Sequence, residues 1–190
     1  MREKMRKLIV AFLTVCMLIS INNISVLAQE MGGNRVIILN DMKDLKQYNG
    51  ADGIYKVRLD NGNWIEITIN TTDIADSRMS VYASETIQKK SYEYKYTYSN
   101  GDLIWKTKVT GTFHFDKTYV WCTYGIAEYD FGDRDHSSIS FSENTYSSAK
   151  VTGVSKYQIK AKITTPAGTY NITQYVGSDP SGQIYYDMSH

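Results

Sequence analysis

The sequence is poor in cysteine, proline and histidine, and these shortages exclude several classes of protein. Of the two cysteines in 190 residues, Cys16 lies in an apolar N-terminal segment, so Cys122 is alone in the rest of the chain and no internal disulfide can form there. The three histidines have no cysteine or second histidine at the spacing of a zinc site. No glycine-flanked serine marks a nucleophile elbow. With 21 basic and 20 acidic residues, the chain also lacks the strong positive field that nucleic acid or an anionic membrane surface requires.

The first 28 residues have the pattern of a secretory signal peptide. Four basic residues precede an apolar segment over 8–21, and small residues lead to Ala28, after which we expect cleavage. An uncleaved anchor is the alternative, whereas lipidation at Cys16 is disfavoured because Val15 stands where a lipoprotein signal has glycine or alanine. We expect a secreted, extracellular monomer with a leader over 29–34, a single domain over 35–190 and no stable membrane insertion after cleavage. Its 17 basic and 19 acidic residues give a net charge of −2.

The stretch 92–98 alternates aromatic and polar residues, which is typical of a half-buried β-strand. Asn100-Gly101 favours a two-residue type I′ turn. The predicted cross-strand pairs are Tyr98 with Leu103, Tyr96 with Trp105, Tyr94 with Thr107 and Tyr92 with Val109. A tight turn at Asp116-Lys117 then returns the chain, so that one dry face collects Gly111, Phe113, Phe115, Thr118, Val120, Cys122, Tyr124 and Ile126. In this meander Cys122 lies opposite Gly111 as a small buried hydrophobe.

A second hairpin is predicted over 54–59 and 64–69. A three-residue loop with Gly62 in the left-handed conformation buries both apolar sets, opposing Val57 with Ile65 and Tyr55 with Ile67. Between this hairpin and the meander, we expect a turn at 71–73 and a strand over 79–83, with the rest of 70–90 an excursion between sheets. The other expected elements are a strand over 35–39, a helix over 41–48 capped by Asp41, strands over 138–142 and 146–152, a hairpin over 156–176 closed by Thr165-Pro166-Ala167-Gly168, and a last strand over 183–188. About nine short strands with at most one short helix predict an all-β, antiparallel β-sandwich of Ig-like or jelly-roll-like type.

Both faces of the meander are candidate binding surfaces. The tyrosine face could stack against sugar rings, but its continuity with apolar residues favours a place in the sandwich core. The opposite face carries aromatic residues among hydrogen-bonding groups, which is typical of a binding surface. A second packing layer across it, formed by 70–90, is the alternative. The predicted ligand-binding residues are Trp121, Tyr119, His114 and Tyr129.

An acidic loop follows the meander. Asp130, Asp133 and Asp135 offer oxygen ligands of the kind that calcium takes, and a secreted protein meets calcium at high concentration. Their spacing differs from that of an EF-hand loop and Arg134 lies among them, so an ordinary solvated loop is the alternative. No other cofactor is indicated.

No arrangement of residues predicts a catalytic centre. Cys122 and His114 fall on opposite faces of the predicted hairpin, which removes the obvious dyad. The paired carboxylates of a glycoside hydrolase depend on the fold, and the sequence singles out no pair. We predict a non-enzymatic binding or interaction module for the cell envelope, a glycan or a protein partner. The alternatives are a glycan-directed hydrolase of sandwich fold and an exported antagonist or toxin-like factor.

Three segments carry a resemblance to other proteins. They are Val109-Thr110-Gly111-Thr112-Phe113-His114-Phe115-Asp116, Val120-Trp121-Cys122 and Asp179-Pro180-Ser181-Gly182-Gln183-Ile184. Through these turns and alternating strands, the C-terminal half resembles a loose group of small secreted proteins from Gram-positive bacteria. The resemblance implies a bacterial protein that is exported and folds as a sandwich. It carries over no functional residue, because the function of that group is unknown.

Overall fold

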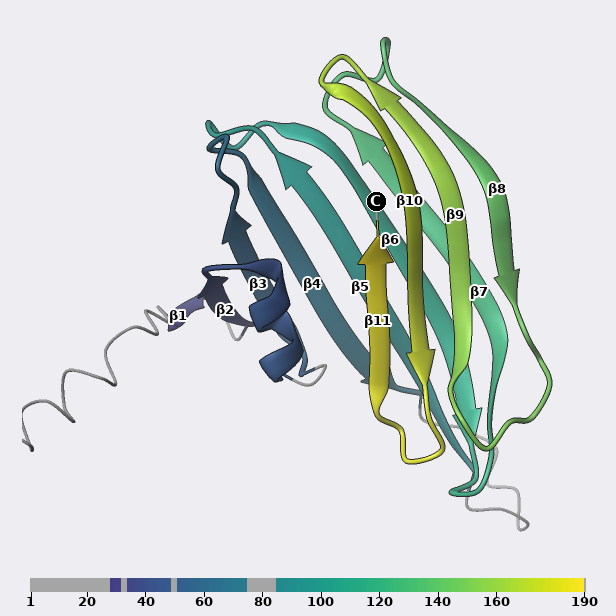
Figure 1. Ribbon diagram of the computed structural model, residues 1–190. Helices are drawn as coiled ribbons and strands as arrows, with labels where there is room; N and C mark the ends of the chain where they lie inside the picture. Colours follow the sequence, from purple (N-terminus) through teal and green to yellow (C-terminus); the bar gives the residue numbers. More distant parts are fainter. Residues whose placement is uncertain (1–27, 32–33, 49–50, 75–84, 190) are drawn as a thin grey trace, which may run out of the picture.

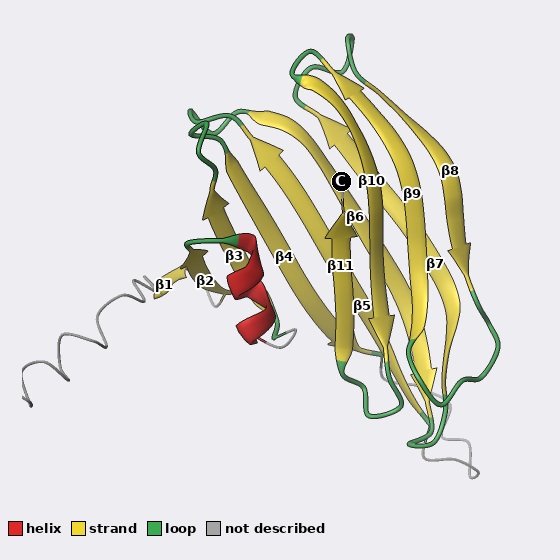
Figure 2. Ribbon diagram, viewed as in Figure 1, coloured by secondary structure: helices red, strands yellow, loops and turns green. Residues whose placement is uncertain are grey.

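A computed structural model describes residues 28–31, 34–48, 51–74 and 85–189 (Figure 1, Figure 2). Its elements are β1 (Ala28–Met31), β2 (Asn34–Leu39), the 3-10 helix η1 (Met42–Tyr48), β3 (Gly53–Arg58), β4 (Trp64–Asp73), β5 (Thr86–Thr97), β6 (Leu103–Phe115), β7 (Val120–Phe131), β8 (Ser138–Tyr146), β9 (Ser155–Thr165), β10 (Gly168–Ser178) and β11 (Ile184–Ser189). The expected signal peptide, apart from Ala28, and the expected strand over 79–83 lie outside the described residues.

The described strands form two sheets that face each other (Figure 1). The larger sheet has seven strands in the order β1-β2-β3-β4-β5-β6-β7, and the smaller has four in the order β11-β10-β9-β8. Neighbouring strands are antiparallel except β2 and β3, which are parallel and are connected through η1. The predicted all-β sandwich is therefore confirmed. Because strands that are neighbours in each sheet are also neighbours in sequence, the topology is simpler than the Greek-key connections of Ig-like and jelly-roll sandwiches.

Alternation of apolar residues predicted the register of two hairpins correctly. In β3 and β4, Val57 lies opposite Ile65 and Tyr55 opposite Ile67, and Gly62 in the loop has a φ of 84°. In β9 and β10, alternation predicts that Ile163 pairs with Tyr170 and Ala161 with Ile172, and the structure has both pairs, closed by the turn 165–168. These registers are strongly specified because a one-residue slip would expose every apolar side chain.

The β5–β6 hairpin has the predicted pairing from Tyr92 to Tyr96, but its turn differs. The backbone N–H of Tyr98 donates to the carbonyl of Asp102, and of the central residues only Gly101 has a positive φ, 92°. The predicted type I′ turn is therefore wrong. The loop has three residues, and the accompanying bulge places Leu103 opposite Thr97 instead of Tyr98.

The chain around residue 70 continues in β4 and does not leave the sheet. Asn70 lies opposite Ser91 and Asp73 opposite Gln88, so β4 and β5 form one long hairpin. The predicted turn at 71–73 is therefore wrong, and residues 70–73 and 86–90 of the predicted excursion belong to β4 and β5, while residues 75–84 lie outside the described residues. Polar residues are accommodated here because the strand ladder satisfies their backbone groups while most of their side chains remain exposed.

The β6–β7 connection is longer than predicted. Its loop comprises residues 116–119, with Lys117 at a left-handed φ of 72°. Cys122 consequently pairs with Phe113 instead of Gly111. It is fully buried, as the sequence predicted for a small hydrophobe, and burial raises the pKa of its thiol to about 11.

A bulge in β7 then inverts the alternation. Thr112 pairs with Tyr124 and the next residue of β6 pairs with Cys122, which leaves Thr123 as the extra residue. The predicted inward positions of Tyr124 and Ile126 are therefore wrong, since their side chains are 52% and 40% exposed.

The chain ends also differ in detail. Residues 29–31, expected in a loose leader, pair with β2 together with Ala28, which was expected to end the signal peptide. The helix expected over 41–48 is the 3-10 helix η1, and Asp41 Oδ1 accepts the backbone N–H of Lys43 at 3.0 Å, as a cap would. One continuous strand, β8, replaces the two expected over 138–152, and Val151 forms only an isolated bridge to β7. None of the helical segments in the described part of the chain has the length and apolar character of a membrane span.

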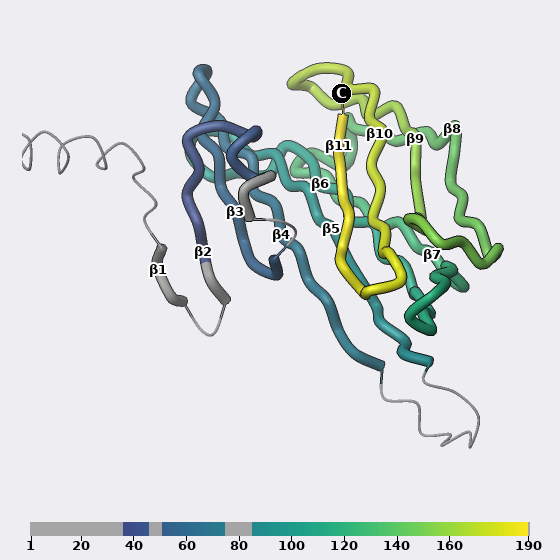
Figure 3. The backbone as a smooth tube through the Cα atoms, turned by 60° about the horizontal axis from the view of Figure 1, so that its bottom comes forward, coloured from purple at the N-terminus to yellow at the C-terminus, as the bar shows by residue number. Residues whose placement is uncertain are grey.

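The core lies between the two sheets. Tyr92, Tyr94 and Trp105 are at most 4% exposed, whereas Lys106 and Lys108 lie on the outer face, so the predicted orientation of the tyrosine strand is confirmed. The smaller sheet covers the β5–β7 part of the larger one (Figure 3). The tyrosine face is therefore core and is not free to stack against sugars.

Candidate functional site

The predicted surface around Trp121 is covered by neighbouring side chains. The imidazole of His114 stacks on the indole, with ring centroids 5.4 Å apart, and Lys150 Nζ lies 4.0 Å from the indole centroid. His114 Nδ1 also contacts the carboxylate of Glu85. The half-buried Trp121 ring thus has little free area for a ligand. A covering layer formed by 70–90 was the alternative interpretation; in the described residues, Lys150 comes from the segment after β8 and Glu85 comes from 70–90.

Of the other two predicted residues, Tyr119 lies in the loop before β7 and Tyr129 lies near the far end of that strand. Tyr119 is 41% exposed, and its backbone N–H donates to Asp116 Oδ1 at 2.8 Å, a hydrogen bond that lowers the pKa of the Asp116 carboxyl. Tyr129 lies on the opposite face of β7, because the bulge inverted the alternation. There its ring is 5.7 Å from that of Phe131 and 6.1 Å from that of Phe141. The four predicted residues do not form one surface.

The acidic loop does not gather its carboxylates. Asp130 Oδ1 accepts hydrogen bonds from Nε and Nη2 of Arg134 at 3.0 and 2.7 Å, which lower the pKa of that carboxyl. Asp133 is engaged by the backbone and ring of His136. Among the described residues, no group of three or more acidic, histidine or cysteine side chains is arranged to hold a metal ion. The predicted calcium ligands Asp130, Asp133 and Asp135 are therefore not brought together as a set.

A hollow on the outer face of the larger sheet has a composition suited to ligand binding. It measures about 410 Å³ and extends across β2, β3, β4 and β5 to the tip of the β5–β6 hairpin. Its apolar wall includes the indole of Trp64 and the side chain of Ile38, which is 37% exposed. The polar residues that line it include Lys56, Glu66, Lys95 and Asn100. An aromatic ring and charged groups of both signs thus converge on one site.

Strand alternation explains why these side chains point outward. Ile65 and Ile67 of β4 are buried in the hydrophobic core, so Trp64 and Glu66 must project from the other face of the sheet. Glu66 faces Lys95 across the β4–β5 pair and Lys56 across the β3–β4 pair. The floor of the hollow is therefore built from three adjacent strands.

The charges on the floor are fixed by ion pairs. Glu66 lies 2.7 Å from Lys56 Nζ and 3.6 Å from Lys95 Nζ. Burial alone would raise the pKa of Glu66, but the hydrogen bond from Lys56 and the charge of Lys95 outweigh it and hold that pKa below its usual value. Arg58 lies 5.8 Å from the Trp64 centroid but does not line the hollow. The carboxylate therefore stays ionised at neutral pH between two ammonium groups.

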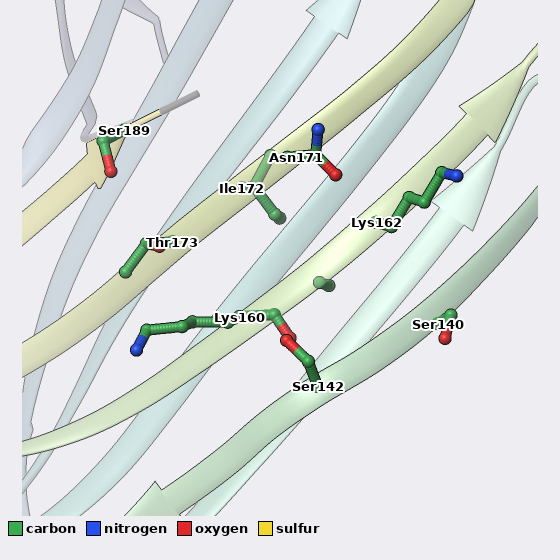
Figure 4. A pocket seen from close by; sticks show the side chains of 9 residues that line it. Ser140, Ser142, Lys160, Lys162, Asn171, Ile172, Thr173 and Ser189 are labelled. Carbon is green, nitrogen blue, oxygen red and sulfur yellow. The ribbon is translucent and has the colours of Figure 1, made fainter.

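A second hollow, of about 470 Å³, lies on the outer face of the smaller sheet (Figure 4). Hydroxyl, amide and ammonium groups line it, and no aromatic ring is among them. Lys160 Nζ is paired with Glu143 at 2.7 Å, and the side chains of Lys160 and Lys162 extend in opposite directions (Figure 4). Because its cations diverge, this hollow is a weaker candidate than the one at Trp64.

The sequence contained part of the signal for the Trp64 site. Trp64 begins a strand whose isoleucines have the opposite parity, so an outward tryptophan follows from the predicted hairpin. Its neighbour Ile38 could not be found in this way, because its place depends on the parallel pairing of β2 with β3. Parity within one hairpin does not reveal which strands lie beyond it.

No family model matches the sequence, and no curated protein or solved structure matches it significantly.

Proposed function

We propose that this protein is an exported, non-enzymatic binding module that recognises a glycan in the Trp64 hollow. The observation that supports this proposal is the convergence of the indole of Trp64 with the ion-paired floor formed by Lys56, Glu66 and Lys95. Sugar rings have apolar faces that stack on aromatic rings, and hydroxyl rims that hydrogen-bond to charged and amide groups. The signal-like N-terminus supports export, which would bring the hollow to the cell envelope.

The chemistry of Glu66 favours binding over glycoside hydrolysis. A general acid in such enzymes needs a raised pKa and a second carboxylate on the other side of the scissile bond. Glu66 is the only carboxylate among the residues that line this hollow, and its pKa is lowered. Its ionised oxygens suit it to accept hydrogen bonds from sugar hydroxyls. An exported antagonist or toxin-like factor would use the same surface without a chemical step.

The test is a glycan-binding measurement on purified protein lacking residues 1–28. A printed panel of cell-wall and capsular glycans identifies ligands, and calorimetry then gives affinities for the wild type and for Trp64→Ala and Glu66→Gln. We expect each variant to bind about tenfold more weakly, since each removes an anchoring contact.

The matched control is Trp121→Ala, which removes an indole from the same face of the same sheet. Its affinity should equal that of the wild type, because His114 and Lys150 already cover that ring. The proposal fails if no glycan binds, or if Trp64→Ala retains the wild-type profile.

A further inference from the structure

The β7 strand has a free edge that is long and rich in apolar residues. One side of β7 pairs with β6 along its whole length. On the other side, Val151 exchanges two hydrogen bonds with Val120, and the carbonyl of Ser147 accepts the backbone N–H of Cys122. Beyond Cys122, no strand of the described chain pairs with this edge. Nine residues, 123–131, therefore form an open edge.

The direction of the free backbone groups follows from these bonds. Val120 and Cys122 direct backbone groups away from β6, toward 147–151. Because Thr123 is the extra residue of the bulge, the alternation resumes with Gly125, Ala127 and Tyr129 in this orientation. Their N–H and C=O groups point away from the sheet, as those of an edge strand do.

The smaller sheet extends beyond this edge. β10 packs against β5 and β6, and β9 packs against β6 and β7, so each lies across two strands of the larger sheet. β8 is the last strand of the smaller sheet, and its contacts with the larger sheet are mainly with β7. Figure 3 shows β8 at the margin of the molecule, next to β7. In the described chain, the larger sheet therefore ends at β7 and has no further strand beneath β8.

Side chains on the underside of β8 are exposed for the same reason. Phe141 pairs with the buried Ala161 and Tyr146 with the buried Tyr157, so both point toward the larger sheet. They are nevertheless 37% and 45% exposed, and Tyr129 on β7 is 52% exposed. Aromatic residues of a sandwich interior stay accessible here because nothing covers them in the described chain.

We propose that an extended segment of a protein partner adds to the free edge of β7 as an eighth strand beneath β8. The segment would pair with up to nine residues, since 147–151 blocks the edge at Cys122. Its inward side chains are apolar and fill the space under Phe141 and Tyr146. Its outward side chain is apolar beside Ile126, whereas Glu128 and Asp130 are already paired with Lys108 and Arg134 and require no charge from the segment.

A single strand fits this edge better than a second copy of the protein. Regular antiparallel pairing of two β7 edges requires a twofold axis perpendicular to the sheet, midway between the two strands. β8 already occupies the space above that position, as its packing beyond β9 shows. The β8 strand of a second copy would be brought to the same place. An isolated peptide strand has no such layer and meets no obstruction.

This site is separate from the Trp64 hollow. β7 is the seventh strand of the larger sheet and β4 the fourth, with β5 and β6 between them. A failure of glycan binding therefore leaves the strand-addition proposal standing, and the reverse also holds.

The test uses a phage-displayed library of random nonapeptides as the probe, selected on the protein lacking residues 1–28. We expect enriched peptides to alternate apolar and polar residues. A synthetic version should slow amide hydrogen exchange at Gly125, Ala127 and Tyr129 by about tenfold or more, because these N–H groups become paired.

Two edge variants and one control locate the site. Ala127→Pro removes a free N–H, and Ile126→Lys introduces the residue that natural edge strands use against pairing. We expect both to weaken peptide binding by about tenfold. Ile126→Lys changes a 40% exposed side chain, so it tests the edge even where the proline variant fails to fold. The control is Ile74→Lys, the same change at an isoleucine that is also 40% exposed but directly follows β4. This variant should bind the peptide as the wild type does.

Three outcomes would overturn the proposal. In the first, the library yields no binder. In the second, the selected peptides bind Ile126→Lys and Ala127→Pro as well as they bind the wild type. In the third, the peptide-free protein sediments as a dimer in which the amides of Gly125, Ala127 and Tyr129 are already protected from exchange. The last result would identify a second copy as the occupant.

Discussion

Gln174 connects the two sheets through a buried amide, and its contacts allow a quantitative prediction. Its side chain is fully buried in β10. Oε1 accepts a hydrogen bond from Thr107 Oγ1 at 2.6 Å, and Nε2 donates to the carbonyl of Tyr92 at 3.0 Å and to that of Thr107 at 3.4 Å. Each polar atom of the amide therefore has a partner on the opposite sheet, in a region from which water is excluded.

Removing both side chains should cost less than the sum of removing each one alone. Gln174→Leu keeps a similar volume but leaves the Thr107 hydroxyl buried without an acceptor, which costs about 1–3 kcal/mol. Thr107→Val leaves Gln174 Oε1 unpaired at a similar cost. In the double variant no orphaned side-chain group remains, and the gain in apolar burial offsets the lost bonds. We therefore expect the double variant to lose well under the sum of the two single losses.

The assay is urea denaturation of the four proteins, with thermal unfolding as a check. For a domain of this size, each kcal/mol should shift the midpoint temperature by about 2–4 °C. A coupling energy of about 1–3 kcal/mol between positions 107 and 174 is the expected result. Strict additivity of the two single losses would refute the reasoning, because it would mean that the two side chains do not depend on each other.

Three further predictions concern other buried groups. Lys90 is 1% exposed, donates to the carbonyl of Gly182 at 2.6 Å, and has its pKa lowered by burial; between that lowered pKa and 10.5 the unfolded chain binds more protons, so the free energy of unfolding should rise with pH in this window, and the rise should be absent in denaturation curves of Lys90→Met. Cys122 should react with a disulfide reagent far more slowly in the native protein than in urea at mildly alkaline pH, because the thiol is buried and its pKa is raised to about 11; equal rates would contradict this burial. Gly125→Ala should cost about 1–3 kcal/mol in denaturation experiments because its Cβ would collide with the ring of Tyr157, whereas the control Gly153→Ala, which has open space, should be close to neutral.

The sequence predicted the register of strands that have one buried face, although it missed the turn at Asn100-Gly101. The alternation from Tyr92 to Tyr96 placed the tyrosines inside and Lys106 outside, as the structure has them. Such prediction works because a slip by one residue exchanges the two faces of a strand. The register around Gly62 was predictable for the same reason.

The bulge at Thr123 could not be predicted from the alternation of apolar residues. One extra residue inverted every later position of β7, which moved Tyr129 off the predicted surface and exposed Ile126. A bulge is a local change in backbone pairing, and alternation on one strand does not locate it. Contacts between the sheets could not be predicted either, since Gln174 and Thr107 are hydrogen-bonded but lie 67 residues apart in the sequence.

The two proposed surfaces lie on parts of the larger sheet that the smaller sheet leaves uncovered, one on its outer face and one at its β7 margin. The four-stranded sheet covers the β5–β7 part of the seven-stranded one, so those strands are committed to the core and leave little inner surface for ligands. The outer face of β2–β5 remains open, and there the Trp64 hollow forms. At the other margin the smaller sheet extends one strand too far, and β8 is left partly uncovered. Covering that margin with an eighth strand would bury aromatic side chains that already belong to the interior. The same argument makes the two sites independent, because no residue that lines the hollow belongs to β7 or β8.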